Sequence, residues 1–216
     1  MPTFRLDRAF FRRDPVTVAR ALLGQRLVRV LPEGRRLAGV IVETEAYLGI
    51  PDRAAHTFGG RHTPRNASMW KDGGHAYVYF TYGMHFCMNV VTEGPRKPPG
   101  NPTAVLLRAL EPTEGLDLMA AQRGLARAPR FDIHHPHSVI ALCSGPAKLC
   151  QALAITRDLD GIDLVTSDTL FIERLRSRAY PTRQIAATPR IGVAYAGPWA
   201  QRPLRFHLHH SPHVSR

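Results

Sequence analysis

The chain has 216 residues, 44% of them hydrophobic and 21% charged, which is ordinary globular usage and excludes wholesale disorder. No apolar run approaches the roughly 20 residues of a membrane helix, and charges interrupt the segment from Met1 to Arg20 where an export signal would be apolar. We therefore expect a cytoplasmic protein, nucleoid-associated if bacterial, with no membrane role. Lys and Arg number 29 against 17 Asp and Glu, a net charge of 29 − 17 = +12 that predicts a polyanionic partner, although GC-rich codons would explain part of the Arg excess.

The first half of the chain predicts a helix followed by strands. Asp14 and Pro15 begin a helix that ends at Gly24, with Asp as N-cap and Pro in the first turn. Residues 51–66 are loop-like. Alternating or aromatic-rich patterns predict strands at residues 25–31, 36–47, 75–80 and 86–91. The last two strands form a hairpin around Tyr82 and Gly83.

The second half mixes strands with two helices. Prolines exclude regular structure at 94–102, and residues 124–138 read as a mobile surface loop. Helices are predicted at 113–123, capped by Thr113, and at 144–155, capped by Ser144. Strands are predicted at 103–110, 170–175, 192–195 and 204–208. Because strands come in runs, we expect one mixed α+β domain over residues 1–216, with a curved, mainly antiparallel sheet surrounded by helices.

Two strands carry charges that a buried strand should not contain. The strand at 36–47 is apolar on both faces and then places Glu43, Glu45 and Tyr47 on one side. A strand emerging into solvent would explain these residues, but Arg108 interrupts a second apolar strand and needs an anion. Glu45 or Glu43 is its expected partner. Such a pair is either structural or catalytic, and the pattern alone leaves both open.

Aromatic residues are dense around the hairpin. Tyr77 and Tyr79 share a face, and for Tyr77 a core position is the simpler interpretation. Tyr82 falls at the hairpin tip, where an exposed ring on a basic protein can act as a wedge between base pairs. Asn89, in a buried strand, has an amide that can read a base edge.

The remaining polar candidates carry weaker signals. His56 is a loop histidine that could contact a ligand, and Arg61, Arg65 and Lys148 could contact phosphates. Three cysteines match neither a disulfide framework nor a zinc knuckle, and the His-rich stretches at 134–137 and 207–210 lack partner carboxylates or thiols. We therefore expect no metal.

Several stretches resemble the alkyladenine (3-methylpurine) DNA glycosylase family, the mammalian-type enzymes. In chain order they are 42–49 (VETEAYLG), 52–66 (DRAAHTFGGRHTPRN), 77–89 with its Tyr-Gly-Met turn, 106–112 (LLRALEP) and 142–153 (LCSGPAKLCQAL). The resemblance runs in order from about residue 8 to the C-terminus, and so many motifs in the right sequence make chance an inadequate explanation.

The resemblance implies a role for each candidate. Glu45 corresponds to the residue that positions and deprotonates water, and Arg108 to its second holder. The other implied roles are walls and edge of a flipped-base pocket (Tyr47, His56, Tyr79), discrimination against guanine (Asn89), the wedge (Tyr82) and a minor-groove contact (Met84). No cofactor is implied, and the implied partner is double-stranded DNA with damaged purines. We expect a monomer, because scanning a duplex suits one.

The chain departs from the family pattern at His85, where relatives often carry Tyr, and in a longer Pro-rich stretch at 95–102. These departures put fine substrate preference in question. Three rival functions remain open at this stage: a non-catalytic minor-groove lesion binder, a metal-dependent hydrolase that uses the His clusters, and an RNA or ribosome partner suggested by charge alone.

Overall fold

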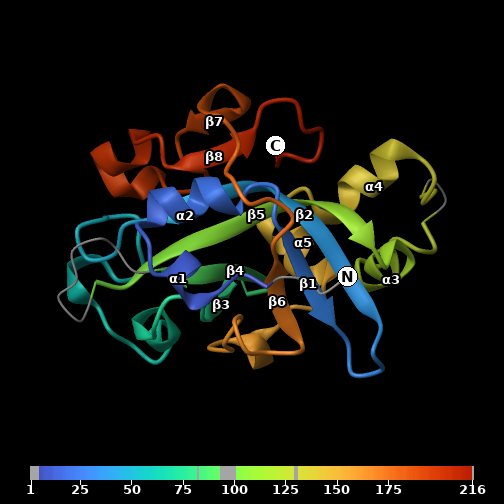
Figure 1. Cartoon of the computed structure of the whole chain (residues 1–216), viewed down its shortest axis with the longest axis horizontal. Helices are drawn as coiled ribbons and strands as arrows, with labels where there is room; N and C mark the ends of the chain where they lie inside the picture. Colours follow the sequence, from blue (N-terminus) through green and yellow to red (C-terminus); the bar gives the residue numbers. More distant parts are fainter. Residues whose placement is uncertain (1–4, 82, 93–100, 129–130, 216) are drawn as a thin grey trace.

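The computed structural model describes residues 5–81, 83–92, 101–128 and 131–215. Its centre is one antiparallel sheet of eight strands in the order β3-β4-β5-β2-β1-β6, to which β8 is joined through β2, and β7 through β8 (Figure 1). The expected α+β fold with an antiparallel sheet is confirmed. The strands are β1 (Arg26–Val30), β2 (Arg36–Tyr47), β3 (Ala76–Thr81), β4 (His85–Thr92), β5 (Thr103–Glu114), β6 (Leu170–Glu173), β7 (Ile185–Thr188) and β8 (Arg205–Leu208).

Short helices surround the sheet. In Figure 1 the N-terminal helix α2 lies beside the C-terminal strands β7 and β8. None of the helices in the described ranges is long and apolar enough to cross a membrane. The α-helices are α1 (Arg8–Phe11), α2 (Pro15–Leu22), α3 (Leu116–Gln122), α4 (Pro136–Cys143) and α5 (Pro146–Ala152), and the 3-10 helices are η1 (Phe58–Gly60), η2 (Ala67–Trp70), η3 (Arg157–Leu159), η4 (Thr182–Gln184) and η5 (Ala194–Gln201).

Local sequence explains the start of α2 as expected. The Asp14 carboxylate accepts from the backbone N–H groups of Val16 and Thr17, and Pro15 occupies the first helical position. Beyond the helix, Gly24 has a φ of +82°, the left-handed region that glycine adopts without strain. The turn delivers the chain into β1.

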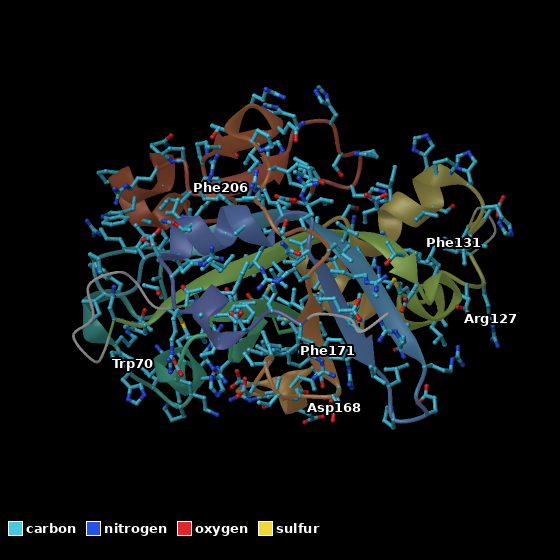
Figure 2. The ribbon with its side chains drawn as sticks, viewed as in Figure 1. Trp70, Arg127, Phe131, Asp168, Phe171 and Phe206 are labelled. Atoms are coloured by element: carbon cyan, nitrogen blue, oxygen red, sulfur yellow. The ribbon has the colours of Figure 1, made fainter. Side chains whose placement is uncertain are left out.

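The strand register gives the two faces of the sheet different roles. Cross-strand partners point to the same side, so the pairings Glu45–Leu106, Leu106–Asn89 and Asn89–Tyr77 place four residues in a row on one face. Most of their neighbours in sequence, Leu107 among them, point to the other face and join the main core, which also holds residues of α2 and α5. Phe206 of β8, labelled in Figure 2, belongs to that core beside α2, with the Arg20 guanidinium 5.5 Å from its ring centre.

The predicted strands at 25–31, 36–47, 75–80, 86–91, 103–110, 170–175 and 204–208 are all present, with small changes in bounds. The cap at Thr113 is wrong. β5 continues to Glu114, the Thr113 hydroxyl donates to the carbonyl of Ala38 in β2, and the helix begins only after Gly115. Sheet pairing outweighs the local capping signal here.

Three other predictions are also wrong in whole or in part. The loop expected at 124–138 ends early, because α4 begins at Pro136, and the following helix is capped by Gly145 and not by Ser144. The strand expected at 192–195 is absent, because the chain enters η5 at Ala194. Of the irregular stretch expected at 94–102, residues 94–100 lie outside the described residues.

Candidate active site

A cavity of about 390 Å³ opens on the face of the sheet that carries the Glu45–Leu106–Asn89–Tyr77 row. This volume falls in the range of small-molecule pockets. Strands β2 to β5 supply its floor, a loop at 54–56 supplies one wall, and the chain at 191–195 supplies another. Trp70 at the end of η2, labelled in Figure 2, packs against a small buried cluster that contains Tyr77 and Met69 of the cavity lining.

Glu45 lies directly behind the cavity lining and is completely buried. Its carboxylate accepts from the Tyr47 hydroxyl at 2.9 Å and from the Ile191 backbone N–H at 2.8 Å, and it lies 3.2 Å from an Arg108 guanidinium nitrogen. Burial raises the pKa of Glu45 above its ordinary value, while Arg108 and the two hydrogen bonds oppose that rise. A carboxylate with a raised pKa close to three lining residues suits a general base.

Arg108 is held by two carboxylates, so both candidate partners suggested by the sequence contact it. Its Nε donates to Glu43 at 2.9 Å while another nitrogen faces Glu45. Burial would raise the pKa of Glu43, but Arg108, the Ser215 N–H and Arg205 together lower it. Glu43 is therefore ionised at neutral pH and fixes the guanidinium from the side away from Glu45.

Three predicted pocket residues lie together on the walls. Tyr47, His56 and Tyr79 all line the cavity, and the His56 and Tyr79 ring centres are 4.6 Å apart, edge to face. Tyr77, for which a core position was the simpler interpretation, is only 1% exposed and yet lines the cavity as well. Burial raises the pKa of all three tyrosines, so their hydroxyls stay protonated.

His56 is neutral at pH 7. Burial and the positive charges of Arg65 and Arg61 lower its pKa to about 4. Its Nδ1 lies 2.7 Å from the Tyr77 hydroxyl, which fixes the ring. The wall therefore presents a hydrogen-bonding edge without adding a positive charge.

Asn89 also lies in the cavity, and its position is fixed. Its amide nitrogen donates to the Tyr77 carbonyl at 3.1 Å across β3 and β4. Cys87, two residues before Asn89 in β4 and on the same face, is a second lining residue. Burial raises the pKa of its thiol.

The predicted wedge, Tyr82, lies outside the described residues. Met84 beside it is 69% exposed, and His85 pairs with Thr81 across the hairpin. The tip of the β3–β4 hairpin thus presents a large apolar side chain to solvent.

The predicted phosphate contacts fall in two places. Arg61 and Arg65 are exposed and line a second hollow of about 440 Å³, together with Arg53, next to the first cavity. The Arg65 guanidinium donates to the Phe80 carbonyl at 2.9 Å. Lys148 is exposed on α5 and belongs to neither hollow.

Sequence reasoning missed the ion pair between Asp52 and Arg190 and the buried contact of Ser215 with Glu43. Ser215 donates to Glu43 through its backbone N–H at 2.6 Å and its hydroxyl at 2.8 Å. Asp52, Arg190 and Ser215 lie outside the helices and strands; Asp52 opens the motif at 52–66, but no sequence pattern pairs any of the three with its partner. Within the described part of the chain, no group of three or more His, Cys, Asp or Glu side chains is arranged to hold a metal ion.

Comparison with known proteins places this chain in a family. Residues 9–212 match the family described as Methylpurine-DNA glycosylase (MPG). Over 211 residues, 98% of this chain, it is 47% identical to the DNA-3-methyladenine glycosylase of Mus musculus and 48% identical to that of Homo sapiens. It is also 47% identical, over 98% of its length, to a putative 3-methyladenine DNA glycosylase of Methanocella arvoryzae.

The relatives differ in length. The chain spans 61% of the mouse protein and 68% of the human protein, but 96% of the Methanocella protein. The matched residues include every strand and every described lining residue of the cavity. The resemblance seen in the sequence is confirmed, and the chain belongs to the methylpurine-DNA glycosylase family.

Proposed function

We propose that the protein is a monofunctional DNA glycosylase that acts as a monomer on alkylated or deaminated purines in duplex DNA. It would rotate the damaged nucleotide out of the helix, hydrolyse its N-glycosidic bond and leave an abasic site. Membership of the family supports this reaction class. The observation that carries the proposal is the buried Glu45 carboxylate, joined to Arg108, Tyr47 and the Ile191 amide at the edge of an aromatic cavity.

The cavity walls suit a methylated purine. An extruded base would lie between Tyr47 and Tyr79, and electron-rich ring faces attract a cationic base. The neutral His56 adds no charge that would repel such a base. Extrusion costs a few kcal/mol, and least for a weakened or mispaired base, which contributes to selectivity.

The chemistry would centre on Glu45. A cationic methylpurine is already a good leaving group, so departure of the base needs little acid assistance. The ionised carboxylate would stabilise the positive charge that develops on the sugar and would activate a water for attack at C1′. Arg108, fixed by Glu43, would keep that carboxylate charged and hold the water from a second side.

A lyase step would require an amine nucleophile to form a Schiff base. The described lysines are poorly placed for this, because Lys71 donates to the Gly161 carbonyl at 3.0 Å and Lys148 is exposed on α5 and does not line the cavity. A hydrolytic, monofunctional reaction is therefore the better fit.

The test is incubation of the purified protein with duplexes that each carry one lesion: 3-methyladenine, 7-methylguanine, hypoxanthine or ethenoadenine. Abasic sites are scored by alkaline cleavage. Glu45→Gln should slow base release by about 10²-fold or more while the variant still binds lesion DNA. If Glu45→Gln and the wild type both bind lesions and neither releases a base, the protein is the non-catalytic lesion binder.

Two further arms address the other rivals. Excision that survives excess chelator excludes a metal-dependent hydrolase. Preference for a single lesion that persists at raised salt excludes an RNA-type partner held only by phosphate attraction, because such attraction weakens as salt rises.

A further inference from the structure

Asp52 and Arg190 form a fully buried ion pair behind the cavity, and both side chains are 0% exposed. The Arg190 guanidinium contacts both carboxylate oxygens of Asp52, at 2.6 and 2.9 Å. A two-pronged contact of this kind fixes the orientation of both groups as well as their separation. The two residues are 138 positions apart in sequence, so the pair joins two separate segments of the chain.

The pair is poorly explained by stability alone. Burying two charges is costly, and apolar residues of similar volume often serve a fold equally well. The Nε of Arg190 is also buried with no hydrogen-bond partner among the described residues, which adds to the cost. A role in placing neighbouring groups explains why these charges stand here.

Each partner holds one wall of the cavity. Asp52 accepts from the backbone N–H groups of Leu48 and Ala54, both at 3.0 Å, and so shapes the loop that leads to His56. Arg190 donates to the Ala46 carbonyl at 3.0 Å, at the end of β2.

Arg190 also reaches the reacting carboxylate through its neighbours. Its guanidinium carbon lies 4.7 Å from the centre of the Tyr47 ring, on which it packs. The next residue, Ile191, donates its backbone N–H to Glu45 at 2.8 Å. Tyr47 itself donates its hydroxyl to the other oxygen of Glu45.

We propose that Asp52 and Arg190 are a positioning pair, which holds the Tyr47 ring and the Ile191 amide against Glu45 and so fixes the geometry of base release. The inference rests on the proposed glycosylase function. Neither member touches the substrate; both act through the residues they hold.

The pair should influence the pH dependence of base release. The Ile191 amide opposes the rise in the pKa of Glu45, so weakening that contact lets the pKa rise further. Glu45 then becomes protonated at a higher pH. The acidic limb of the rate profile, where the rate falls as the pH is lowered, therefore moves to higher pH. The other ionisable groups that face Glu45 are Glu43 and Tyr47 of β2, Tyr79 of β3, Cys87 of β4, Arg108 of β5 and Arg205 of β8.

Arg190→Lys separates the effect of geometry from that of charge, because it keeps the positive charge and removes the two-pronged guanidinium contact with Asp52. A lysine cannot reach both oxygens of Asp52 and the Ala46 carbonyl while packing on Tyr47. We expect single-turnover base release to slow about 10- to 100-fold at pH 7, the usual consequence of a misplaced reacting group. We also expect the acidic limb to move to higher pH, with a smaller change in affinity for lesion DNA.

The matched control is Arg26→Lys. Arg26 forms an equally close pair with Glu173, which is 1% exposed, at the β1–β6 edge of the sheet. Because the Arg26 side chain is 22% exposed and Glu173 keeps Arg36 at 3.0 Å, this control should lose less thermal stability than Arg190→Lys, and its acidic limb should not move. If Arg190→Lys is not recovered folded, the same comparison is made with Asp52→Asn, which keeps the side-chain shape, against Glu173→Gln.

The inference is overturned if the Arg190 or Asp52 variant releases bases at the wild-type rate and the acidic limb of its pH–rate profile stays at the wild-type pH. It is equally overturned if rate and limb change as much in the Arg26 or Glu173 control. A wild-type protein that releases no base from any lesion duplex would instead refute the proposed function, so the two failures are distinguishable.

Discussion

Glu43 lies at the centre of a buried charge cluster, and its replacement by Gln gives a sharp test of how that cluster is held. The carboxylate accepts from Arg108 at 2.9 Å, from Arg205 at 2.6 Å, and from the N–H and hydroxyl of Ser215. A Gln side chain has one accepting oxygen, and its NH₂ group would point two donors at a ring of donors. The change thus leaves positive charge without a counter-charge in a buried site.

The size of the effect follows from the partners that remain. Removing one member of a buried pair costs about 3–5 kcal/mol of unfolding free energy. Arg108 keeps Glu45 at 3.2 Å, and Arg205 is 13% exposed, so the lower figure applies. With a urea m-value at the top of the usual range of about 1–3 kcal/mol per M, a loss of about 3 kcal/mol lowers the urea midpoint by about 1 M.

The pH dependence of this loss has a definite sign. The pKa of Glu43 is lower in the folded protein than its ordinary 4.5, so folding favours the ionised form. The stability that Glu43 contributes is therefore present above about pH 4.5 and is lost as the pH falls through the folded pKa. The difference between the wild type and Glu43→Gln should be constant near neutrality and shrink in acid.

The assay is urea unfolding, followed by circular dichroism, at pH 7 and at several acidic values. Glu111→Gln is the matched control, because Glu111 is an exposed carboxylate on β5 and its replacement should change stability by no more than about 0.5 kcal/mol. A midpoint shift at pH 7 no larger than that of the control would refute the reasoning. So would a difference that stays constant to the most acidic condition.

Three further predictions concern the cavity and its loops. Tyr47→Phe removes the hydroxyl that donates to Glu45, so the pKa of Glu45 should rise and the acidic limb of base release should move to higher pH in a rate profile. Asn66→Ala leaves two loop carbonyls without their donor, which should cost about 1–3 kcal/mol in urea unfolding and increase hydrogen exchange in the loop at 56–66. Gly49→Ala places a Cβ 2.2 Å from the Oδ1 of Asn101 at a φ of +75°, so the melting temperature should fall by several degrees.

Each of these has an outcome that contradicts it. An unchanged pH profile in Tyr47→Phe would mean that its hydroxyl does not tune the carboxylate. Unaltered exchange in Asn66→Ala would mean that water replaces the lost donor. A Gly49→Ala protein that melts at the wild-type temperature would show that the adjacent loop moves aside freely.

Most of the correct predictions about the candidate site came from the alternation of side chains along single strands. The pattern in β2 placed Glu43, Glu45 and Tyr47 on one side, and an interrupted apolar run identified Arg108 as needing an anion. Both inferences depend on rules that act within one strand. The structure adds the register that brings β2 against β5, where Arg108 meets both carboxylates.

Features fixed by contacts between distant loops were not predictable in this way. No local signal pairs Asp52 with Arg190, since each is a charged residue in an irregular segment. The strand expected at 192–195 failed for a similar reason. Its Gly and Val pattern resembles a strand, but Val193 packs with Ala54 and Ala196 in a small cluster, and η5 follows at once. The role of Tyr77 was ambiguous because it is both buried and part of the cavity wall.

One face of the sheet lines the cavity and the other packs in the core, and this arrangement limits which mutations the strands can accept. In β5, Leu106 and Arg108 face the cavity while Leu107 faces the core, so adjacent residues of the strand contribute to different parts of the protein. A substitution disturbs one side only. Deletion of a single residue that no bulge absorbs shifts the frame of the strand, turns the guanidinium toward the apolar interior and turns a leucine toward the cavity. A change in the length of these strands therefore has to be absorbed by a connecting loop or by a β-bulge, as in the irregular register between β2 and β5 near Glu43.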